Sequence, residues 1–314
     1  MHSLSPTVSV VMPCYNVAQF LLRSIGSLLA QTYSGWELIA IDDGSSDGTA
    51  ATLRRMGHPR ISVLEQRHAG ASAARNRGIE VAKGKFLAFL DADDEWHPEF
   101  LERMTHALLA DSNAILAYCG WQNVGLPGAR GAPFIPQEHQ GDERLRWLVG
   151  GCRWPIHAAL TRTGAVRAAG GFPLGQTNAE DFSLWLRVAT CGPIVRVPLV
   201  LAYYHFHDHP QASSNRAQAS VQMWRTQCRF LEECPEIART LGRRSARHLT
   251  YGQLADRGLE AHWRRDFETS RVIFAQLVAK RYLPPRTWSA VAALLMPSAL
   301  RDWWLADDMR TPEP

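Results

Sequence analysis

The first 120 residues alternate short apolar runs with longer stretches in which apolar residues recur at helical spacing. This alternation is typical of βαβ units, whose strands form a mostly parallel sheet with helices on its faces. The pattern therefore predicts an α/β fold. The expected strands are Val8–Met12, Trp36–Ile41, Ile61–Leu64, Phe86–Leu90 and Ala114–Tyr118. The expected helices are Ala18–Ala30, Gly48–Met56, Ala71–Ala82 and Pro98–Ala110, with Ser46 or Asp47 as the N-cap of the second.

The rest of the chain divides into three parts. Gln122–Gly141 is rich in Gly, Pro and Gln and has little apolar periodicity, so we expect an irregular loop. A mixed stretch follows, with a helix expected over Glu180–Thr190 and a strand over Ile194–Val197. From Asn215 onward the spacing is helical. We therefore expect an α/β domain over residues 7–215 and an α-helical C-terminal region over residues 216–314.

Composition narrows the function classes. The 314 residues are 46% hydrophobic and 20% charged, and no run approaches the ~18 apolar residues of a membrane span, which excludes disordered and integral membrane proteins. No secretory signal is expected at the N-terminus. Six cysteines without a C-x-x-C pair argue against disulfides and cysteine zinc sites and favour the cytoplasm. The net charge of +4 comes without any binding motif, so we expect no nucleic-acid partner.

Polar residues follow the first two expected strands, at the sheet edge where such folds bind ligands. Tyr15 comes directly after Pro13 and Cys14, and its ring either stacks on a nucleobase or packs on a neighbouring helix. Asp42 and Asp43 follow the second strand, where a carboxylate can accept hydrogen bonds from a base imide or a ribose.

Three carboxylates, those of Asp91, Asp93 and Asp94, follow the apolar strand Phe86–Leu90. Their mutual repulsion is costly without a cation, and hard oxygen ligands of this kind select Mg²⁺ or Mn²⁺. The alternative is that Asp93 or Asp94 caps the helix near Pro98, which leaves Asp91 without a role.

Two further candidates lie on expected helices. Arg75 either binds a pyrophosphate through two donors or is an ordinary solvated arginine. Glu180 and Asp181 open an apolar helix, where acidic residues are favoured by the helix dipole.

The strings VSVVMPCYN, ELIAIDDGSSDGT, GASAARNRGIEVAKGKFLAFLDADD, AGGF and AED occur in this order and resemble glycosyltransferase family 2, over roughly residues 7–215. The resemblance implies a GT-A fold and inverting, metal-assisted transfer of a sugar, often from UDP, to an acceptor hydroxyl of a saccharide or glycoconjugate. It implies that Pro13, Tyr15, Asp42 and Asp43 hold the nucleoside, Arg75 binds the donor, Asp91 contacts the ribose, Asp93 with Asp94 holds Mn²⁺ or Mg²⁺, and Asp181 is the general base.

The segment Tyr204–His207, followed by Ser213, resembles the family's strand-end pattern of tyrosine, arginine, any residue and histidine, with serine a few residues later. His205 stands where arginine is usual, which speaks against a phosphate contact there. His207 remains a candidate for the metal or the leaving group.

The family resemblance leaves two alternatives, a non-catalytic nucleotide-sugar-binding protein and a sugar nucleotidyltransferase. A nucleotidyltransferase needs a glycine- and basic-rich loop where this chain has Pro13–Asn16. The expected partners are a nucleotide-sugar donor and a saccharide or lipid-linked saccharide acceptor. An apolar face of the C-terminal region packs on its own domain, forms a homodimer, or contacts the inner face of an anionic membrane. That face comprises Trp288, Val291, Leu294, Leu295, Trp303 and Trp304.

Overall fold

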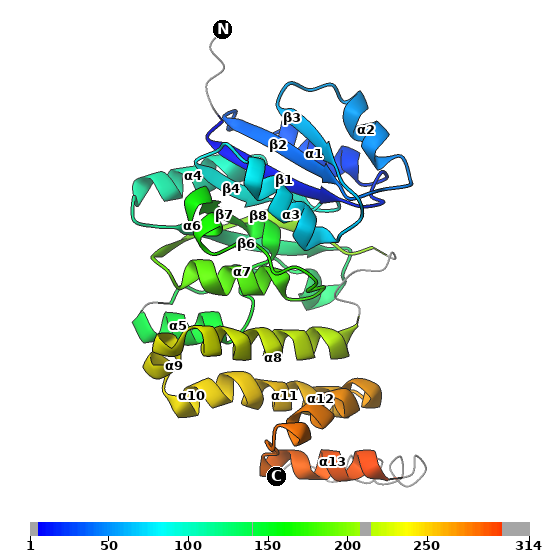
Figure 1. Cartoon of the computed structure of the whole chain (residues 1–314), viewed down its shortest axis with the longest axis vertical. Helices are drawn as coiled ribbons and strands as arrows, with labels where there is room; N and C mark the ends of the chain where they lie inside the picture. The colour runs from blue at the N-terminus through cyan, green and yellow to red at the C-terminus, as the bar shows by residue number, and fades with distance from the viewer. Residues whose placement is uncertain (1–5, 140, 208–214, 297–314) are drawn as a thin grey trace. The chain divides into compact units, whose positions relative to one another are not determined.

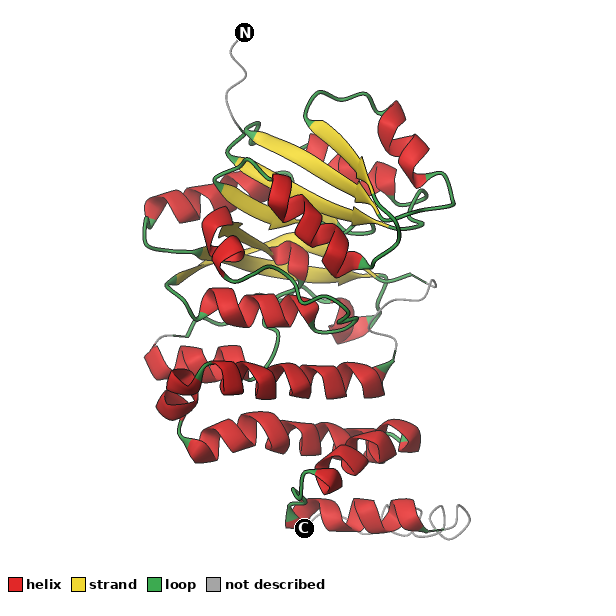
Figure 2. Ribbon diagram, viewed as in Figure 1, coloured by secondary structure: helices red, strands yellow, loops and turns green. Residues whose placement is uncertain are grey.

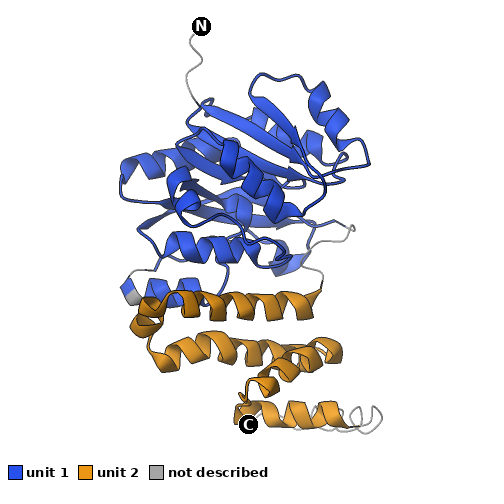
Figure 3. Cartoon of the chain, viewed as in Figure 1, with its two compact units in different colours: residues 1–211 blue, residues 212–314 orange. Residues whose placement is uncertain are grey.

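The computed structural model describes residues 6–139, 141–207 and 215–296. The chain divides into two compact units, residues 1–211 and residues 212–314 (Figure 3). The division lies four residues from the domain boundary expected from the sequence, at 211 instead of 215. The first unit contains the sheet, and the second is helical (Figure 1). The expected α/β fold with a helical C-terminal region is therefore confirmed.

The first unit is built on one eight-stranded sheet with the strand order β3-β2-β1-β4-β7-β6-β8-β5. Strands β1 to β4 pair in parallel, as do β6 and β8. Strand β7 runs antiparallel to β4 and β6, and β5 antiparallel to β8, so the sheet is mixed. The strands are β1 Val8–Cys14, β2 Trp36–Asp42, β3 Ile61–Glu65, β4 Phe86–Phe89, β5 Glu95–Trp96, β6 Leu116–Val124, β7 Ala159–Arg162 and β8 Ile194–His205.

Helices cover the sheet of the first unit (Figure 2). The helix expected from Ala18 begins at Leu21, and the one expected from Pro98 begins at Phe100. The N-cap of α2 is Gly48 and not Ser46 or Asp47, although Asp47, one residue earlier, accepts a hydrogen bond of 3.0 Å from the Thr49 amide. The helices are α1 Leu21–Leu29, α2 Thr49–Arg55, α3 Ala71–Val81, α4 Phe100–Ala110, α5 Gly141–Val149, α6 Thr163–Ala168 and α7 Glu180–Ala189, with 3₁₀ turns η1 Gly128–Gly131 and η2 Ile156–Ala158.

Strands β6 and β8 are longer than expected. Strand β8 continues beyond Val197 because a bulge accommodates Pro198, which cannot donate a ladder hydrogen bond: Cys119 pairs with Val197, but Gly120 pairs with Val200. The expected irregular loop is correspondingly shorter, since β6 reaches Val124. This extension brings the end of β8 to β5, directly after the carboxylates that follow β4.

Close packing of α3 on β1 places one candidate residue. A Cβ atom on Gly78 would lie 2.4 Å from a methyl carbon of Val11, so only glycine permits this approach. Arg75 lies one turn earlier on the same buried helix face and is itself buried. The close approach at Gly78 thus places the long charged side chain of Arg75 next to the sheet.

The second unit has its own hydrophobic core, formed by residues such as Trp224, Leu254 and Phe274. Val291 and Leu294 of the proposed apolar face pack against this core, whereas Trp288 and Leu295 are exposed; Trp303 and Trp304 lie outside the described residues. None of the helices in the described ranges combines the length and hydrophobicity needed to cross a bilayer. The helices are α8 Arg216–Glu233, α9 Pro235–Leu241, α10 Arg243–Arg247, α11 Gln253–Trp263, α12 Phe267–Ala279 and α13 Trp288–Leu295, with a π-helical turn His248–Gly252 before α11 and a 3₁₀ turn Pro285–Thr287 before α13.

Candidate active site

The candidate residues meet at the carboxyl edge of three neighbouring parallel strands. Cys14 pairs with Asp42 at the ends of β1 and β2, and Val11 pairs with Phe89 near the end of β4. Parallel strands bring their carboxyl ends to one edge of a sheet, which is where ligands bind in such folds (Figure 1). The structure therefore gathers the three polar segments that the sequence predicts to be functional.

The side chain of Pro13, near the end of β1, is half-buried, and that of Tyr15, directly after the strand, is 46% exposed. The Tyr15 ring stacks on the ring of His68, with centroids 4.0 Å apart and an angle of 22° between their planes. His68 comes from the loop between β3 and α3, and the sequence offered no signal for it. The exposed tyrosine is thus held in a stacking arrangement at the mouth of the site.

The two carboxylates after β2 have different surroundings. Asp43 accepts hydrogen bonds from the amides of Ala69 and Gly70 and from Gln66 Nε2, at 2.7–2.9 Å, and His68 Nδ1 lies 2.9 Å from its Oδ2. These four partners fill the acceptor positions of a carboxylate, and Asp43 is only 1% exposed. Asp42 has one long hydrogen bond, 3.3 Å from the Ser45 amide to Oδ2, and its buried Oδ1 has no hydrogen-bond partner within the part of the chain that the structure describes.

Arg75 joins two carboxylates at the end of β4 and the start of α7. Its Nη2 lies 2.7 Å from Asp91 Oδ1, and its Nη1 lies 3.1 Å from Glu180 Oε1. The burial of the guanidinium acts against its charge, but both carboxylates more than compensate, so the pKa of Arg75 is raised. Arg75 therefore stays charged and is already paired within the chain.

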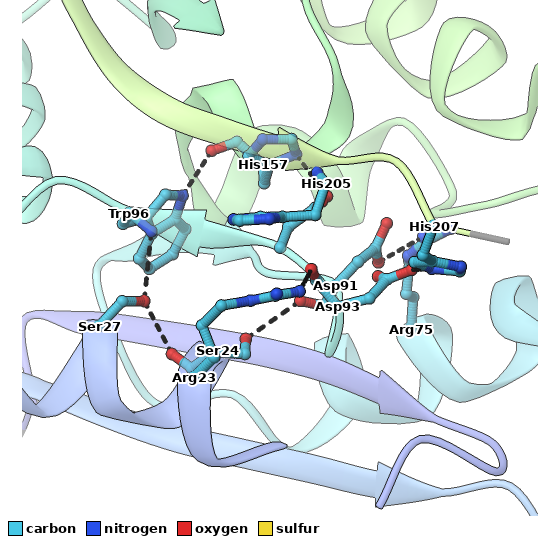
Figure 4. A network of polar contacts seen from close by, with 11 residues as sticks. Arg23, Ser24, Ser27, Arg75, Asp91, Asp93, Trp96, His157, His205 and His207 are labelled. Atoms are coloured by element: carbon cyan, nitrogen blue, oxygen red, sulfur yellow. Dashed lines mark hydrogen bonds and ion pairs between the residues drawn. The ribbon is translucent and has the colours of Figure 1, made fainter. Parts of the chain in front are cut away.

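Asp93 forms a close pair with His207, whose Nε2 lies 3.0 Å from Asp93 Oδ2 (Figure 4). Burial raises the pKa of Asp93, and the charges of Asp94 and Asp91 raise it further. The His207 ring stacks on Phe20, which immediately precedes α1, at a centroid distance of 4.7 Å. The end of β8 and the start of α1 thus meet at Asp93. Ser213 lies outside the described residues.

Asp94 lies deeper than Asp93 and is 1% exposed. Its Oδ1 accepts a hydrogen bond of 3.0 Å from the backbone amide of His205, and its Oδ2 lies 3.0 Å from Nδ1 of the buried His157. The backbone carbonyl of His157 in turn accepts a hydrogen bond from the Trp96 indole (Figure 4). The structure therefore places Asp94 in a buried contact between β4, η2 and β8, apart from the Asp93–His207 pair.

Asp181 lies in the first turn of α7, and its Oδ1 accepts a hydrogen bond from the Phe182 amide. The thiol of Cys152 lies 3.7 Å from its Oδ2. Burial, and after it the neighbouring charge of Glu180, raises the pKa of Asp181 to about 6. Burial also raises the pKa of Cys152, so this thiol stays protonated beside the carboxylate. Such a carboxyl is suited to exchange protons near neutral pH.

Within the described ranges, no three His, Cys, Asp or Glu side chains form a ready metal-binding cluster. The Asp93–His207 pair nevertheless fits a divalent cation of the Mg²⁺ class, because such ions often take only one or two protein ligands and complete their shell with water and substrate phosphate. The raised pKa of Asp93 is consistent with this, since burial first, and then the charges of Asp94 and Asp91, disfavour an ionised form that a bound cation would stabilise.

Comparisons with known proteins show similarity to glycosyltransferases. The family model described as Glycosyl transferase family 2 matches residues 9–146. The UDP-Glc:alpha-D-GlcNAc-diphosphoundecaprenol beta-1,3-glucosyltransferase WfgD of Escherichia coli is 30% identical over 228 residues, which cover 72% of this chain and 87% of that protein.

Two solved structures share the fold. The crystal structure of S. aureus TarS 1–349 in complex with UDP-GlcNAc matches with a TM-score of 0.60 and 16% identity, covering 80% of each chain. The mannosyltransferase PcManGT from Pyrobaculum calidifontis, in complex with GDP-Man and Mn²⁺, matches with a TM-score of 0.59 and 20% identity, covering 96% of this chain and 84% of that one.

Proposed function

The chain belongs to glycosyltransferase family 2, and from this premise we propose that it moves a sugar from a UDP-sugar to a saccharide hydroxyl with inversion at the anomeric carbon. The observation that carries the proposal is the environment of Asp181, a half-buried carboxylate in the first turn of α7 with a pKa of about 6. Near neutral pH it is largely ionised and able to accept a proton.

The nucleoside is proposed to lie over the ends of β1 and β2. Tyr15 offers an exposed aromatic face beside Pro13. Asp42 offers an oxygen that no group among the described residues satisfies. Asp43 acts on this site through the loop that it anchors, because its oxygens already bind residues 66–70. Asp91 is proposed to contact the ribose, and Arg75 to hold Asp91 in place for it.

Asp93 and His207 are proposed to hold Mn²⁺ or Mg²⁺, and the fold neighbour crystallised with GDP-Man and Mn²⁺ supports this assignment. A divalent cation bound there supplies neutralisation for the negative charge of the departing diphosphate. Asp94 positions the pair indirectly, because it accepts a hydrogen bond from the backbone amide of His205, two residues before His207. We therefore assign Asp94 to positioning instead of ligation.

Asp181 is proposed as the general base. The acceptor oxygen attacks the anomeric carbon from the face opposite the diphosphate, and its proton passes to the carboxylate. Oδ2 is the better candidate for the receiving atom, because Oδ1 already accepts a hydrogen bond from the Phe182 amide, whereas Oδ2 contacts the weakly donating thiol of Cys152. A direct displacement of this kind needs no covalent intermediate on the enzyme.

The acceptor is proposed to be a saccharide, carried on a lipid diphosphate. Support comes from the relative WfgD, whose name specifies a diphosphoundecaprenol-linked acceptor. The exposed Trp288 and Leu295 of α13 offer a site of peripheral contact with the membrane in which such a lipid resides. The corresponding location is the cytoplasmic face of that membrane.

A panel of nucleotide sugars tests the proposal, with release of nucleoside diphosphate measured in the presence of Mn²⁺. Asp181→Asn should reduce transfer by at least 100-fold, because the variant cannot accept the proton, while donor affinity stays within about threefold of wild type. Asp111→Asn is the matched control: Asp111 is exposed and stabilises a turn that Asn also favours. Equal losses of donor affinity and transfer in Asp181→Asn would show that the residue positions substrate instead.

A further inference from the structure

Two arginines lie beside the carboxylates that follow β4, and only one of them has its charge paired. The buried Arg75 uses one terminal nitrogen for Asp91 and the other for Glu180, at 2.7 and 3.1 Å. Because two carboxylates already surround it, Arg75 has little positive charge to offer to a phosphate group. A diphosphate at this site therefore needs a cation from elsewhere in the chain.

Arg23, in the first turn of α1, meets this requirement. Its Nη2 donates a hydrogen bond of 2.6 Å to the backbone carbonyl of Asp93, and the guanidinium lies 5.8 Å from the centre of the Phe20 ring. Among the residues that the structure describes, no carboxylate oxygen lies within 4.0 Å of it. A carbonyl oxygen is neutral, so the contact fixes the direction of the guanidinium and leaves its charge uncompensated.

The position of Arg23 is fixed by the same residues that form the proposed metal site (Figure 4). Ser24, the next residue on α1, donates a hydrogen bond of 3.1 Å to the carbonyl of Asp91. Phe20 stacks on His207, which contacts the side chain of Asp93. The backbone carbonyl of Asp93 thus binds Arg23 and its side chain binds His207, so a single residue connects the cation to the proposed metal pair.

The strand-end segment does not supply this charge itself. His205 stands next to the site, but its Nε2 lies 3.0 Å from Glu95 Oε2, so its ring is engaged by a carboxylate. Arg23 is therefore the exposed cation that the first turn of α1 contributes to this rim.

We propose that Arg23 binds a diphosphate oxygen next to the Asp93–His207 pair, an inference that rests on the proposed function. Arginine suits this task because it is always charged and its planar group presents paired N–H donors to phosphate. Two diphosphates have the required chemistry, that of the nucleotide donor and that of a lipid-linked acceptor. The two sources predict different binding behaviour.

The first arm of the test compares nucleoside diphosphate and monophosphate affinities by calorimetry with Mn²⁺. Arg23→Gln should lower the affinity for UDP, or for GDP if the base is guanine, by about tenfold, which is a typical effect of losing one charge-assisted hydrogen bond. The same variant should change the affinity for UMP or GMP by less than twofold. The affinity of Arg23→Lys for the nucleoside diphosphate should lie between those of Arg23→Gln and the wild type. Arg55→Gln is the matched control, since Arg55 is exposed and likewise donates one hydrogen bond to a neutral oxygen, the Thr52 hydroxyl.

The second arm titrates inorganic pyrophosphate into protein saturated with UDP and Mn²⁺. Loss of pyrophosphate binding in Arg23→Gln, with UDP affinity unchanged, would place the acceptor's diphosphate at Arg23. If the wild type binds UDP or GDP and Arg23→Gln changes neither nucleotide nor pyrophosphate affinity by more than twofold, the role of Arg23 is overturned while the proposed function stands. If wild type binds neither nucleotide with Mn²⁺, the proposed function fails and the inference falls with it.

Discussion

Carboxylates follow both β2 and β4 at the same edge of one sheet, and the two groups are used in opposite ways. Asp43, after β2, is surrounded by N–H donors from residues 66–70. After β4, Asp93 pairs with His207, and burial together with the charges of Asp94 and Asp91 raises its pKa. A carboxylate whose acceptor positions are filled by N–H donors of the chain stabilises the fold, whereas one close to other carboxylates is suited to bind a cationic ligand.

The largest effect expected from this difference is on activity. Asp93→Asn should reduce transfer by about 1,000-fold, because removal of the carboxylate removes the proposed hold on the cation that neutralises the diphosphate. The same variant should not lose stability without metal. The folded-state pKa of Asp93 lies above its usual value, so at neutral pH its ionised form lowers the free energy of unfolding. The neutral amide of Asn removes this electrostatic cost.

Thermal unfolding with and without Mn²⁺ checks this prediction beside the activity measurement. Mn²⁺ should raise the melting temperature of the wild type and of the control Asp111→Asn, but not that of Asp93→Asn. An equal stabilisation of Asp93→Asn by Mn²⁺ would mean that the cation binds elsewhere.

A smaller effect, on stability, is expected after β2. Asp43→Asn should lower the free energy of unfolding by about 2–3 kcal/mol, because an amide group would face buried donors that now bind carboxylate oxygens. Asp42→Asn is a matched neighbour with one long hydrogen bond, and it should cost less than about 1 kcal/mol. Urea unfolding followed by far-UV circular dichroism measures both values. Equal costs for the two variants would remove the distinction between the adjacent carboxylates.

These two carboxylates also mark how far sequence reasoning reaches. Apolar periodicity predicts the strands before Asp42 and Asp91, and parallel strands bring their ends to one edge, so the location of the site follows from the sequence. The partners of Asp43 do not, because the amides of Ala69 and Gly70 lie 26 and 27 positions later and any residue type supplies an amide. The local pattern of Asp42 and Asp43 is therefore the same whether a carboxylate binds ligand or backbone.

The residues that sequence reasoning missed share this property. Arg23 lies on a helix whose pattern reports only its buried face, Leu21, Ile25 and Leu28, and nothing in that spacing indicates a contact with Asp93. Strand β8 was predicted too short because Pro198 usually ends a strand, and a bulge made its continuation possible. Both features depend on contacts between segments far apart in the sequence, which periodicity does not encode.

The smallest expected effect concerns the carboxylates of α7, which extend the group after β4 through Arg75. Activity should fall as the pH decreases through about 6, because Asp181 must be ionised to accept a proton. Glu180 raises the pKa of Asp181 by its charge and also pairs with Arg75, whose charge lowers that pKa. Glu180→Gln removes the repulsion between Glu180 and Asp181, and it leaves Arg75 with one carboxylate partner fewer, so that its charge acts more strongly on Asp181. Both changes lower the pKa of Asp181, so the acid limb of kcat/KM should move to lower pH by roughly half a unit.

The matched control for this shift is Glu99→Gln, which removes a carboxylate from an exposed pair with Arg103 and should leave the acid limb unchanged. A shift of the limb to higher pH in Glu180→Gln would contradict the assignment, because it would mean that Glu180 stabilises the ionised form of the base. An unshifted limb in both variants would instead show that another group controls the pH profile. The pH profile thus tests whether mutual repulsion among these carboxylates, and not burial alone, sets the pKa of the proposed base.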